Sequence, residues 1–346
     1  MYRDKLGKLN TLPHHKIENY SGFKLPACNK IKTIKKHQYF IVEGMVITGD
    51  APKAFMRVYE YKEKQHIRKS NIKSWPLYIV KTGHKWYMSE SVTEYLLNQL
   101  GIDFGLEMAE SKIAFVSGQL RFFSKFFLNK ENFELVHGAD IFAGYLGDKD
   151  FVERIEEQQL SRELFTLQFI EKALEYIFPY QKDDIMSELT KMLLFDALVG
   201  NNDRHFYNWG VIRSLDNSSS PKFSPVYDTA RGLFWNDSEQ KIRSVWSDKE
   251  RLDAYIRRYS NQSKPKIGWD GEKNINHFKL VEKICSEQYY ISKAQQKELF
   301  SDALMNRMLY TIKKKFKNYY SVERTGVITK CLIFRFNHIK RIIEQC

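Results

Sequence analysis

The chain changes its hydrophobic periodicity once, and this change limits the folds that it can adopt. Up to about residue 127, short runs of β-branched and aromatic residues predict strands at 38–42, 55–61, 77–80 and 120–123. One predicted helix interrupts them. It starts near Ser89 or Ser91 and continues through Leu100, and Glu94 follows Ser91 at the spacing of a capping box.

After about Val136, apolar residues recur every three or four positions, which predicts helices within 160–177, 184–199, 278–290 and 297–319. Between them, 209–213 and 223–227 have the composition of two short strands that flank a turn-prone segment. We therefore predict an α+β protein with two lobes and a cleft between them. The expected parts are an N-terminal extension at 1–37, a strand-rich N-lobe at 38–130 and a mostly helical C-lobe at 131–346.

Bulk properties exclude several classes of protein. A chain of 346 residues can bury a sufficient core without a metal ion or disulfides. The four cysteines are far apart and no leader sequence is visible, which favours a reduced, cytoplasmic protein. The longest apolar runs are shorter than the roughly 20 residues that cross a bilayer, so no membrane association is expected. The net charge of +13 favours polyanionic partners, but no nucleic-acid motif accompanies it, so any role for nucleic acid is expected to be indirect.

One irregular segment, 200–208, concentrates chemically active side chains. It follows the predicted helix at 184–199 and carries Asp203, His205 and Asn208 within six residues. If the two strands at 209–213 and 223–227 form a hairpin, Asn208 precedes the first strand and Asp228 follows the second. Both would then lie at the open end of the hairpin, beside Asp203.

Oxygen-bearing side chains that converge in this way suit Mg²⁺, which takes one or two ligands from protein and the rest from phosphates and water. Asn208 and Asp228 are the predicted ligands. Asp203 precedes Asn208 by five residues, which is the spacing of the acid and the asparagine in the catalytic loop of protein kinases. We therefore predict that Asp203 is the base that accepts the proton of a substrate hydroxyl.

The upstream half supplies a candidate cation for nucleotide phosphates. Lys81 directly follows the strand predicted at 77–80, and Glu94 or Glu90 could hold its ammonium group. A capping role explains Glu94 equally well. The segment 46–53, which contains Thr48, Gly49 and Lys53, joins two predicted strands and could cover the phosphates, although its single glycine is a weak signal.

These motifs together resemble a known family. Gly-Asn-Asn-Asp-Arg-His-Phe-Tyr-Asn at 200–208 and Ser-Pro-Val-Tyr-Asp at 224–228 resemble the catalytic loop and metal-binding strand of the HipA-type bacterial serine/threonine kinases. Upstream, 49–53 is similar to the Gly-x-x-x-Lys phosphate loop of the family, 78–81 to its nucleotide-lysine strand and 93–95 to its glutamate helix. The resemblance covers about residues 40–290 in the family's order and implies a bilobal, kinase-like fold.

The resemblance implies transfer of phosphate from ATP, with Mg²⁺, to a serine or threonine hydroxyl. By matched position, Asp203 would be the base, His205 a supporting residue of the catalytic loop, Asn208 and Asp228 the metal ligands, and Lys81 a phosphate contact. Thr48 is the hydroxyl nearest to the autophosphorylated serine of the family's phosphate loop.

The family also implies partners. It includes toxins of toxin–antitoxin pairs, so the resemblance implies an antitoxin partner and a protein substrate such as an aminoacyl-tRNA synthetase or another translation factor. Two departures are visible. Only about 37 residues precede the first predicted strand, where family members carry a further N-terminal subdomain, and 122–126 lacks the family's acidic-Arg-Phe-Asp hinge.

Two functions of different classes are compatible with this sequence. The first is an active serine/threonine kinase. The second is a weakly active kinase-like module whose basic surface binds an antitoxin, nucleic acid or a synthetase complex, and a lipid kinase is a weaker third. The set Lys81, Asp203, Asn208 and Asp228 favours the first, because a binding module needs neither a base nor two metal ligands.

Overall fold

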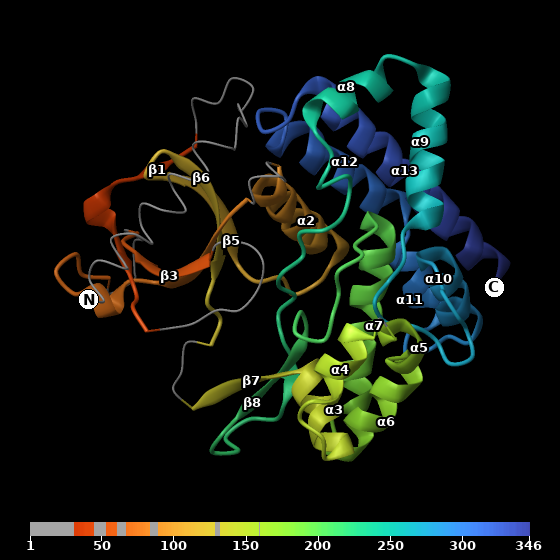
Figure 1. Cartoon of the computed structure of the whole chain (residues 1–346), viewed down its shortest axis with the longest axis horizontal. Helices are drawn as coiled ribbons and strands as arrows, with labels where there is room; N and C mark the ends of the chain where they lie inside the picture. The colour runs from red at the N-terminus through yellow and green to blue at the C-terminus, as the bar shows by residue number, and fades with distance from the viewer. Residues whose placement is uncertain (1–30, 45–52, 61–66, 84–88, 129–131, 159) are drawn as a thin grey trace.

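The computed structural model describes residues 31–44, 53–60, 67–83, 89–128, 132–158 and 160–346, and every structural statement below refers to these residues. A curled sheet forms one part of the molecule and a group of helices forms the other (Figure 1). Helix α2, Glu90–Phe104, packs against strands of the sheet on one side and against helices of the second part on the other. The predicted α+β class, with a strand-rich N-terminal lobe and a mostly helical C-terminal lobe, is confirmed.

The large sheet has six strands in the order β1-β5-β6-β4-β3-β2. Their bounds are Thr33–Ile34 (β1), Tyr39–Ile41 (β2), Lys53–Val58 (β3), Leu77–Thr82 (β4), Ser111–Val116 (β5) and Gln119–Lys125 (β6). All neighbouring pairs are antiparallel except β1 and β5.

Neighbouring residues of a strand point to opposite faces of a sheet, and the core follows this rule. On β6, Leu120 packs against the large core that continues into the helices, whereas Phe123 belongs to a smaller core on the other face. The same division separates Ile113 from Ala114 on β5. Both faces of the sheet are therefore buried, and among the described residues the face with Ile113 belongs to the core shared with the helices.

A second sheet has three strands in the order β7-β8-β9, with bounds Phe133–His137, Gly210–Ser214 and Lys222–Phe223. Strands β8 and β9 pair antiparallel, with Val211 opposite Phe223. A hairpin is present as predicted, but its second strand is Lys222–Phe223 and does not extend over the predicted 223–227. Strand β7 is an addition to it, because the sequence interpretation assigned no strand or helix between about residues 127 and 136.

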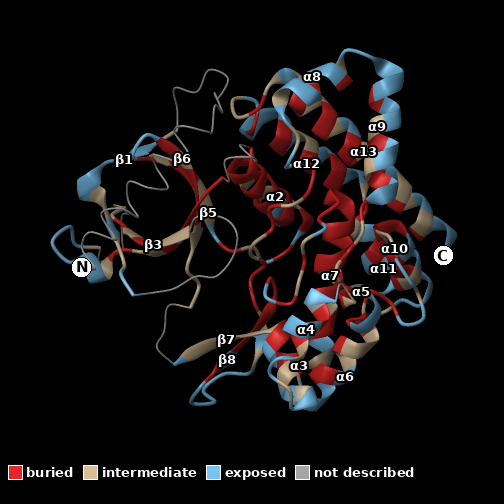
Figure 2. Ribbon diagram, in the orientation of Figure 1, coloured by how far each residue is buried: buried red, intermediate tan, exposed pale blue. Residues whose placement is uncertain are grey.

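The helical part is built around α7, Lys182–Val199, which contacts α2, α6, α10 and α13. Most of its length is buried (Figure 2). The other helices are α3 Gly138–Leu146, α4 Phe151–Glu157, α5 Ser161–Leu164, α6 Leu167–Ile177, α8 Glu239–Trp246, α9 Lys249–Gln262, α10 His277–Ser286, α11 Lys293–Leu299, α12 Asp302–Lys315 and α13 Val322–Gln345.

Two predicted helices were wrong in their extent. The segment 297–319 is divided between α11 and α12, because Ser301 caps α12 by accepting a hydrogen bond from the Leu304 backbone N–H (3.4 Å). The segment 160–177 is likewise divided between α5 and α6, where Thr166 caps the second helix. None of the described helices combines the length and apolar character needed to span a bilayer. The boundaries predicted at residues 37 and 130 stay predictions.

Candidate active site

The end of α7 starts the polar loop that carries Asp203. Gly200 ends the helix with φ +69°, a left-handed conformation that glycine adopts without steric cost. A Cβ atom at this position would lie 2.8 Å from the hydroxyl oxygen of Tyr259. The positive φ and the nearby Tyr259 both require glycine at this position. The left-handed conformation of Gly200 sets the direction in which the chain leaves α7.

Within the loop, hydrogen bonds hold Asp203 and Asn208 near each other. The Asn208 side-chain amide donates to the backbone carbonyl of Asp203 (2.8 Å), and the backbone N–H of His205 donates to the same carbonyl (2.8 Å). The Asn201 side-chain amide donates to Asp196 of α7 (2.9 Å). Because Nδ2 of Asn208 is used inside the loop, its Oδ1 is the atom left for a metal ion.

Arg204 ties this loop to the end of the hairpin. Its guanidinium is buried and donates from Nε and Nη2 to the two carboxylate oxygens of Asp196 (2.8 and 3.1 Å). It also donates to the backbone carbonyls of Asn208 and Tyr227 (both 2.9 Å) and to the Thr229 hydroxyl (2.7 Å). One side chain therefore fixes both chain neighbours of Asp228, Tyr227 and Thr229, and links them to Asn208 of the loop.

The sequence interpretation assigned no role to Arg204. The signal that could have revealed it is Asp196, a charged residue in the otherwise apolar run 192–199 of α7. A buried carboxylate needs a charged or hydrogen-bonding partner, and Arg204 lies eight residues later.

Asp228 lies after β9 and adopts φ +51°, which is uncommon for residues other than glycine and best tolerated by Asn and Asp. Its carboxylate lies 2.6 Å from Lys81 Nζ and 3.6 Å from Lys53 Nζ. Burial tends to raise the pKa of Asp228, but the two lysines outweigh it and hold this pKa below its usual range. Asp228 is therefore a stable anion in the pocket.

Lys53 and Lys81 reach Asp228 because they stand opposite each other on β3 and β4. Directly opposed residues of an antiparallel pair share a face of the sheet, so both ammonium groups extend to the same side. Lys81 Nζ also lies 2.7 Å from Glu94 Oε1 on α2. Burial disfavours its charge, yet Asp228 and Glu94 outweigh this cost and raise the pKa of Lys81.

The structure decides between the two interpretations of Glu94. Helix α2 begins at Glu90 with Ser89 as its N-cap, so Ser91 lies inside the helix and forms no capping box with Glu94. Glu94 instead pairs with Lys81, as the kinase interpretation expects. Burial, reinforced by the charge of Asp228, outweighs the pull of Lys81 and raises the pKa of Glu94 to about 7.

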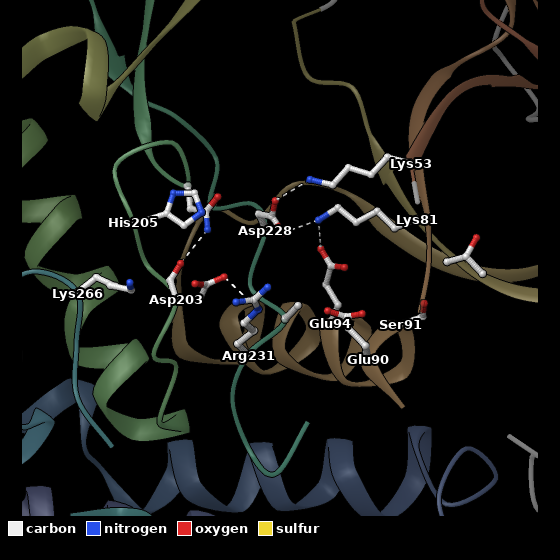
Figure 3. A pocket seen from close by; sticks show the side chains of 13 residues that line it. Lys53, Lys81, Glu90, Ser91, Glu94, Asp203, His205, Asp228, Arg231 and Lys266 are labelled. Atoms are coloured by element: carbon white, nitrogen blue, oxygen red, sulfur yellow. Dashed lines mark hydrogen bonds and ion pairs between the residues drawn. The ribbon is translucent and has the colours of Figure 1, made fainter. Parts of the chain in front are cut away.

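These groups line one pocket of about 300 Å³. Figure 3 shows Lys53 and Lys81 on one side, Asp203 and Lys266 on the other, and Asp228 between them. The lining residues are Lys53, Lys81, Thr82, Glu90, Ser91, Glu94, Asp203, His205, Asn208, Asp228, Ala230, Arg231 and Lys266. The predicted residues Thr48 and Gly49 lie outside the described residues.

Arg231 and Lys266 are lining residues that the sequence interpretation did not assign. Arg231 Nε lies 3.2 Å from Asp203 Oδ2, and its guanidinium stands over the Trp235 ring at 5.1 Å from the centroid. Burial raises the pKa of Asp203, and the nearby charges of Arg231 and Lys266 partly oppose this rise. A raised pKa suits a carboxylate that accepts a proton near neutral pH.

His205 also lines the pocket. Its Nδ1 accepts a hydrogen bond from the backbone N–H of Tyr207 (3.3 Å). Tyr227 braces the same segment, because its hydroxyl donates to the Tyr207 carbonyl (3.0 Å). These contacts are compatible with the predicted supporting role of His205 in the loop.

The donor set fits a hard divalent cation. Within the described residues no three His, Cys, Asp or Glu side chains gather into a metal site. A cation here would therefore depend on the Asp228 carboxylate, the Asn208 amide oxygen and oxygens from a bound phosphate. This is the mixed coordination that Mg²⁺ adopts at nucleotide sites.

Comparisons with known proteins identify the family and the fold of this chain. The family model of the HipA-like C-terminal domain matches residues 45–289. A curated relative, the serine/threonine-protein kinase CtkA of Helicobacter pylori, is 29% identical over 90 residues, which are 26% of this chain and 26% of the relative. The chain thus aligns with about a quarter of the length of that relative.

Two solved structures are similar. The proinflammatory kinase CtkA of Helicobacter pylori has a TM-score of 0.67 at 19% identity, with 90% of this chain and 97% of that chain covered, so the two share a fold. HipA from a Shewanella oneidensis complex with HipB and operator DNA has a TM-score of 0.48 at 12% identity, with 95% of this chain and 70% of that chain covered.

Proposed function

The chain belongs to the HipA-like kinase family, and from this premise we propose that it is a serine/threonine protein kinase that transfers the γ-phosphate of ATP to a protein hydroxyl. One observation carries the proposal. Lys81 meets Glu94 and Asp228, which come from separate elements, in the pocket that Asp203 and Asn208 also line. Phosphoryl transfer requires a base, oxygen ligands for the metal and a lysine that an ion pair positions for the nucleotide phosphates.

In the proposed reaction, the acceptor oxygen forms a bond to the γ-phosphorus while the bond from that phosphorus to the bridging oxygen of ATP breaks. ADP leaves with the electron pair, and the hydroxyl proton passes to the Asp203 carboxylate. Arg231 orients that carboxylate through its ion pair. Lys81, held by Glu94, binds phosphate oxygens, and Lys53 adds a second positive charge on the same side of the pocket.

Asn208 and Asp228 would hold Mg²⁺, which when bound neutralises charge on the phosphate oxygens. His205 supports the loop between the base and these ligands. We propose that Thr48 and Gly49, with Lys53, form the loop that covers the phosphates. This assignment rests on the family resemblance.

The direct test incubates the purified chain with labelled ATP and Mg²⁺ beside Asp203→Asn and Asp228→Asn variants. Phosphosites in a cell lysate are then mapped. Folding of each variant is checked by circular dichroism, because both substitutions alter a packed charge cluster. We expect serine or threonine labelling by the wild type alone. Equal labelling by wild type and both variants would contradict the proposal.

The same experiment distinguishes the active kinase from the second candidate, a kinase-like module that binds partners through its basic surface. Such a module would bind ATP without transferring phosphate. The ion-paired set around Asp228 favours the enzyme, because binding alone gives no reason to place a base beside a lysine and two oxygen ligands.

We extend the proposal to the cellular role that the family resemblance implies, namely a toxin restrained by an antitoxin protein. Its substrate would be an aminoacyl-tRNA synthetase or another translation factor. Induced expression of the wild type should arrest growth, and the Asp228→Asn variant should not. Co-expression of a candidate antitoxin should restore growth.

A further inference from the structure

The charges of the pocket leave one cation without an ion-pair partner among the described residues. Lys53 and Lys81 pair with Asp228, and Arg231 pairs with Asp203. Lys266 lines the same pocket and forms no ion pair within the described part of the chain. An ammonium group at the wall of a pocket gains most from an anion that a ligand brings.

The segment that carries Lys266 is firmly anchored. Ser263 Oγ donates to the carbonyl of Gly200, where the loop carrying Asp203 begins (3.2 Å). Further along, the Gly268 backbone N–H donates to the Phe165 carbonyl (3.0 Å), and the Leu167 N–H donates to the Gly268 carbonyl (3.1 Å). Pro265 and Ile267, on either side of Lys266, are buried. The backbone therefore presents Lys266 in a fixed position relative to Asp203.

The location of Lys266 indicates which molecule would bring the anion. Figure 3 shows Lys53 and Lys81 beyond Asp228 on one side and Lys266 beyond Asp203 on the opposite side. Lys266 is near enough to act electrostatically on Asp203. Phosphates held by Lys53, Lys81 and the oxygen ligands would lie on the first side. A group that reaches Lys266 would instead belong to the molecule whose hydroxyl meets the base.

We infer that Lys266 recognises an acidic side chain of the acceptor protein, close in sequence to the serine or threonine that receives the phosphate. The inference rests on the proposed kinase function and adds a substrate class to it, namely hydroxyls flanked by Asp or Glu. The net charge of +13 also favours an acidic partner. A lysine suits this role because its ammonium group is a point charge on a flexible stem. It can donate hydrogen bonds to carboxylates that approach from several directions.

The test compares short peptides that contain one serine or threonine flanked by Asp, by Ala or by Lys, with a phosphoserine-flanked peptide as a fourth arm. Values of kcat/KM are measured for the wild type, Lys266→Ala and Lys266→Glu. Lys264→Ala is the matched control, because Lys264 belongs to the same segment and has similar exposure but does not line the pocket. Circular dichroism and ATP binding verify that each variant is folded.

We expect the wild type to prefer the Asp-flanked over the Ala-flanked peptide, and Lys266→Ala to reduce this ratio about tenfold. Lys266→Glu should reverse the preference for acidic flanks, so that the Lys-flanked peptide becomes the better substrate. Lys264→Ala should retain the wild-type ratio. A preference for phosphoserine above Asp that Lys266→Ala abolishes would also support recognition of an anion by Lys266 and would identify phosphate as the preferred group.

Two results overturn the inference and leave the kinase in place. In one, the acidic preference is the same in wild type and Lys266→Ala. In the other, Lys266→Ala lowers kcat equally for all peptides, which would place Lys266 on the transferred phosphoryl group. Absence of phosphorylation of any peptide, and of any protein in the lysate, would instead overturn the proposed function together with the inference.

Discussion

Lys81 Nζ and Asp228 Oδ1 lie 2.6 Å apart although the two residues are separated by 147 positions in the chain. One belongs to the sheet and the other follows the hairpin of the helical part, so this ion pair joins the two lobes across the pocket. The lysine neutralises the carboxylate to which we assign Mg²⁺. If ATP and Mg²⁺ bind as proposed, this ion pair would be replaced by a contact of Lys81 with phosphate and a contact of Asp228 with the metal.

Lys81→Met should weaken both the fold and nucleotide binding. It leaves Glu94 and Asp228 without their closest cation, and removal of one partner of a buried pair typically costs about 3–5 kcal/mol. Denaturant unfolding and calorimetric titration with ATP measure the two effects. Lys53→Met is the control with the smaller expected loss of stability, since Lys53 lies 3.6 Å from Asp228. Equal losses for the two variants would contradict the central role of Lys81.

Glu94 should give the protein without nucleotide a specific pH dependence. Its pKa in the folded chain is about 7, compared with 4.5 for an ordinary glutamate, because burial disfavours its charge. Between these values the folded chain keeps a proton that the unfolded chain releases, so this group lowers stability as pH rises from 4.5 to about 7.

Glu94→Gln removes this titration. The unfolding free energy of the variant relative to the wild type should therefore increase over the same pH range. Glu107→Gln, at an exposed position, is the control for the substitution itself. Parallel curves for wild type and Glu94→Gln would show that Glu94 titrates normally.

Arg204→Lys should uncouple the catalytic loop from Asp228. The arginine donates five hydrogen bonds to Asp196, Asn208, Tyr227 and Thr229, whereas a lysine has one nitrogen with three donors. We expect a loss of roughly 3 kcal/mol in stability and a fall in kcat of about a hundredfold. Thr229→Val removes one of these bonds and should cost about 1 kcal/mol. A normal kcat in Arg204→Lys would exclude the positioning role.

Removal of Mg²⁺ should abolish most of the stabilisation that ATP gives. A ligand at a hundred times its Kd stabilises the folded state by about 2.7 kcal/mol, which a thermal shift assay detects. We expect the shift with ATP and Mg²⁺ to disappear with EDTA in the wild type. In Asp228→Asn the shift should be small with or without metal. A shift in the variant that equals the wild type would remove Asp228 from the ligand set.

Several features followed from local sequence alone. The polar loop at 200–208 and the hairpin after it were predictable because a helix end, a turn and two short β-rich segments are each specified by neighbouring residues. The strand before Lys81 was predictable for the same reason. By contrast, β7 was missed, because its five residues become a strand only when Gly210–Ser214 of β8 lies beside them.

The tertiary structure decided the rest. Glu94 fits both a helix cap and an ion pair in sequence, and only the approach of Lys81 from β4 selects the second. Arg231 and Lys266 have no local pattern that marks them as pocket residues, because Lys266 reaches the pocket through contacts of its segment with Gly200 and Phe165. Local periodicity specifies elements through neighbours in the chain, whereas the charge of a pocket depends on distant residues that packing brings together.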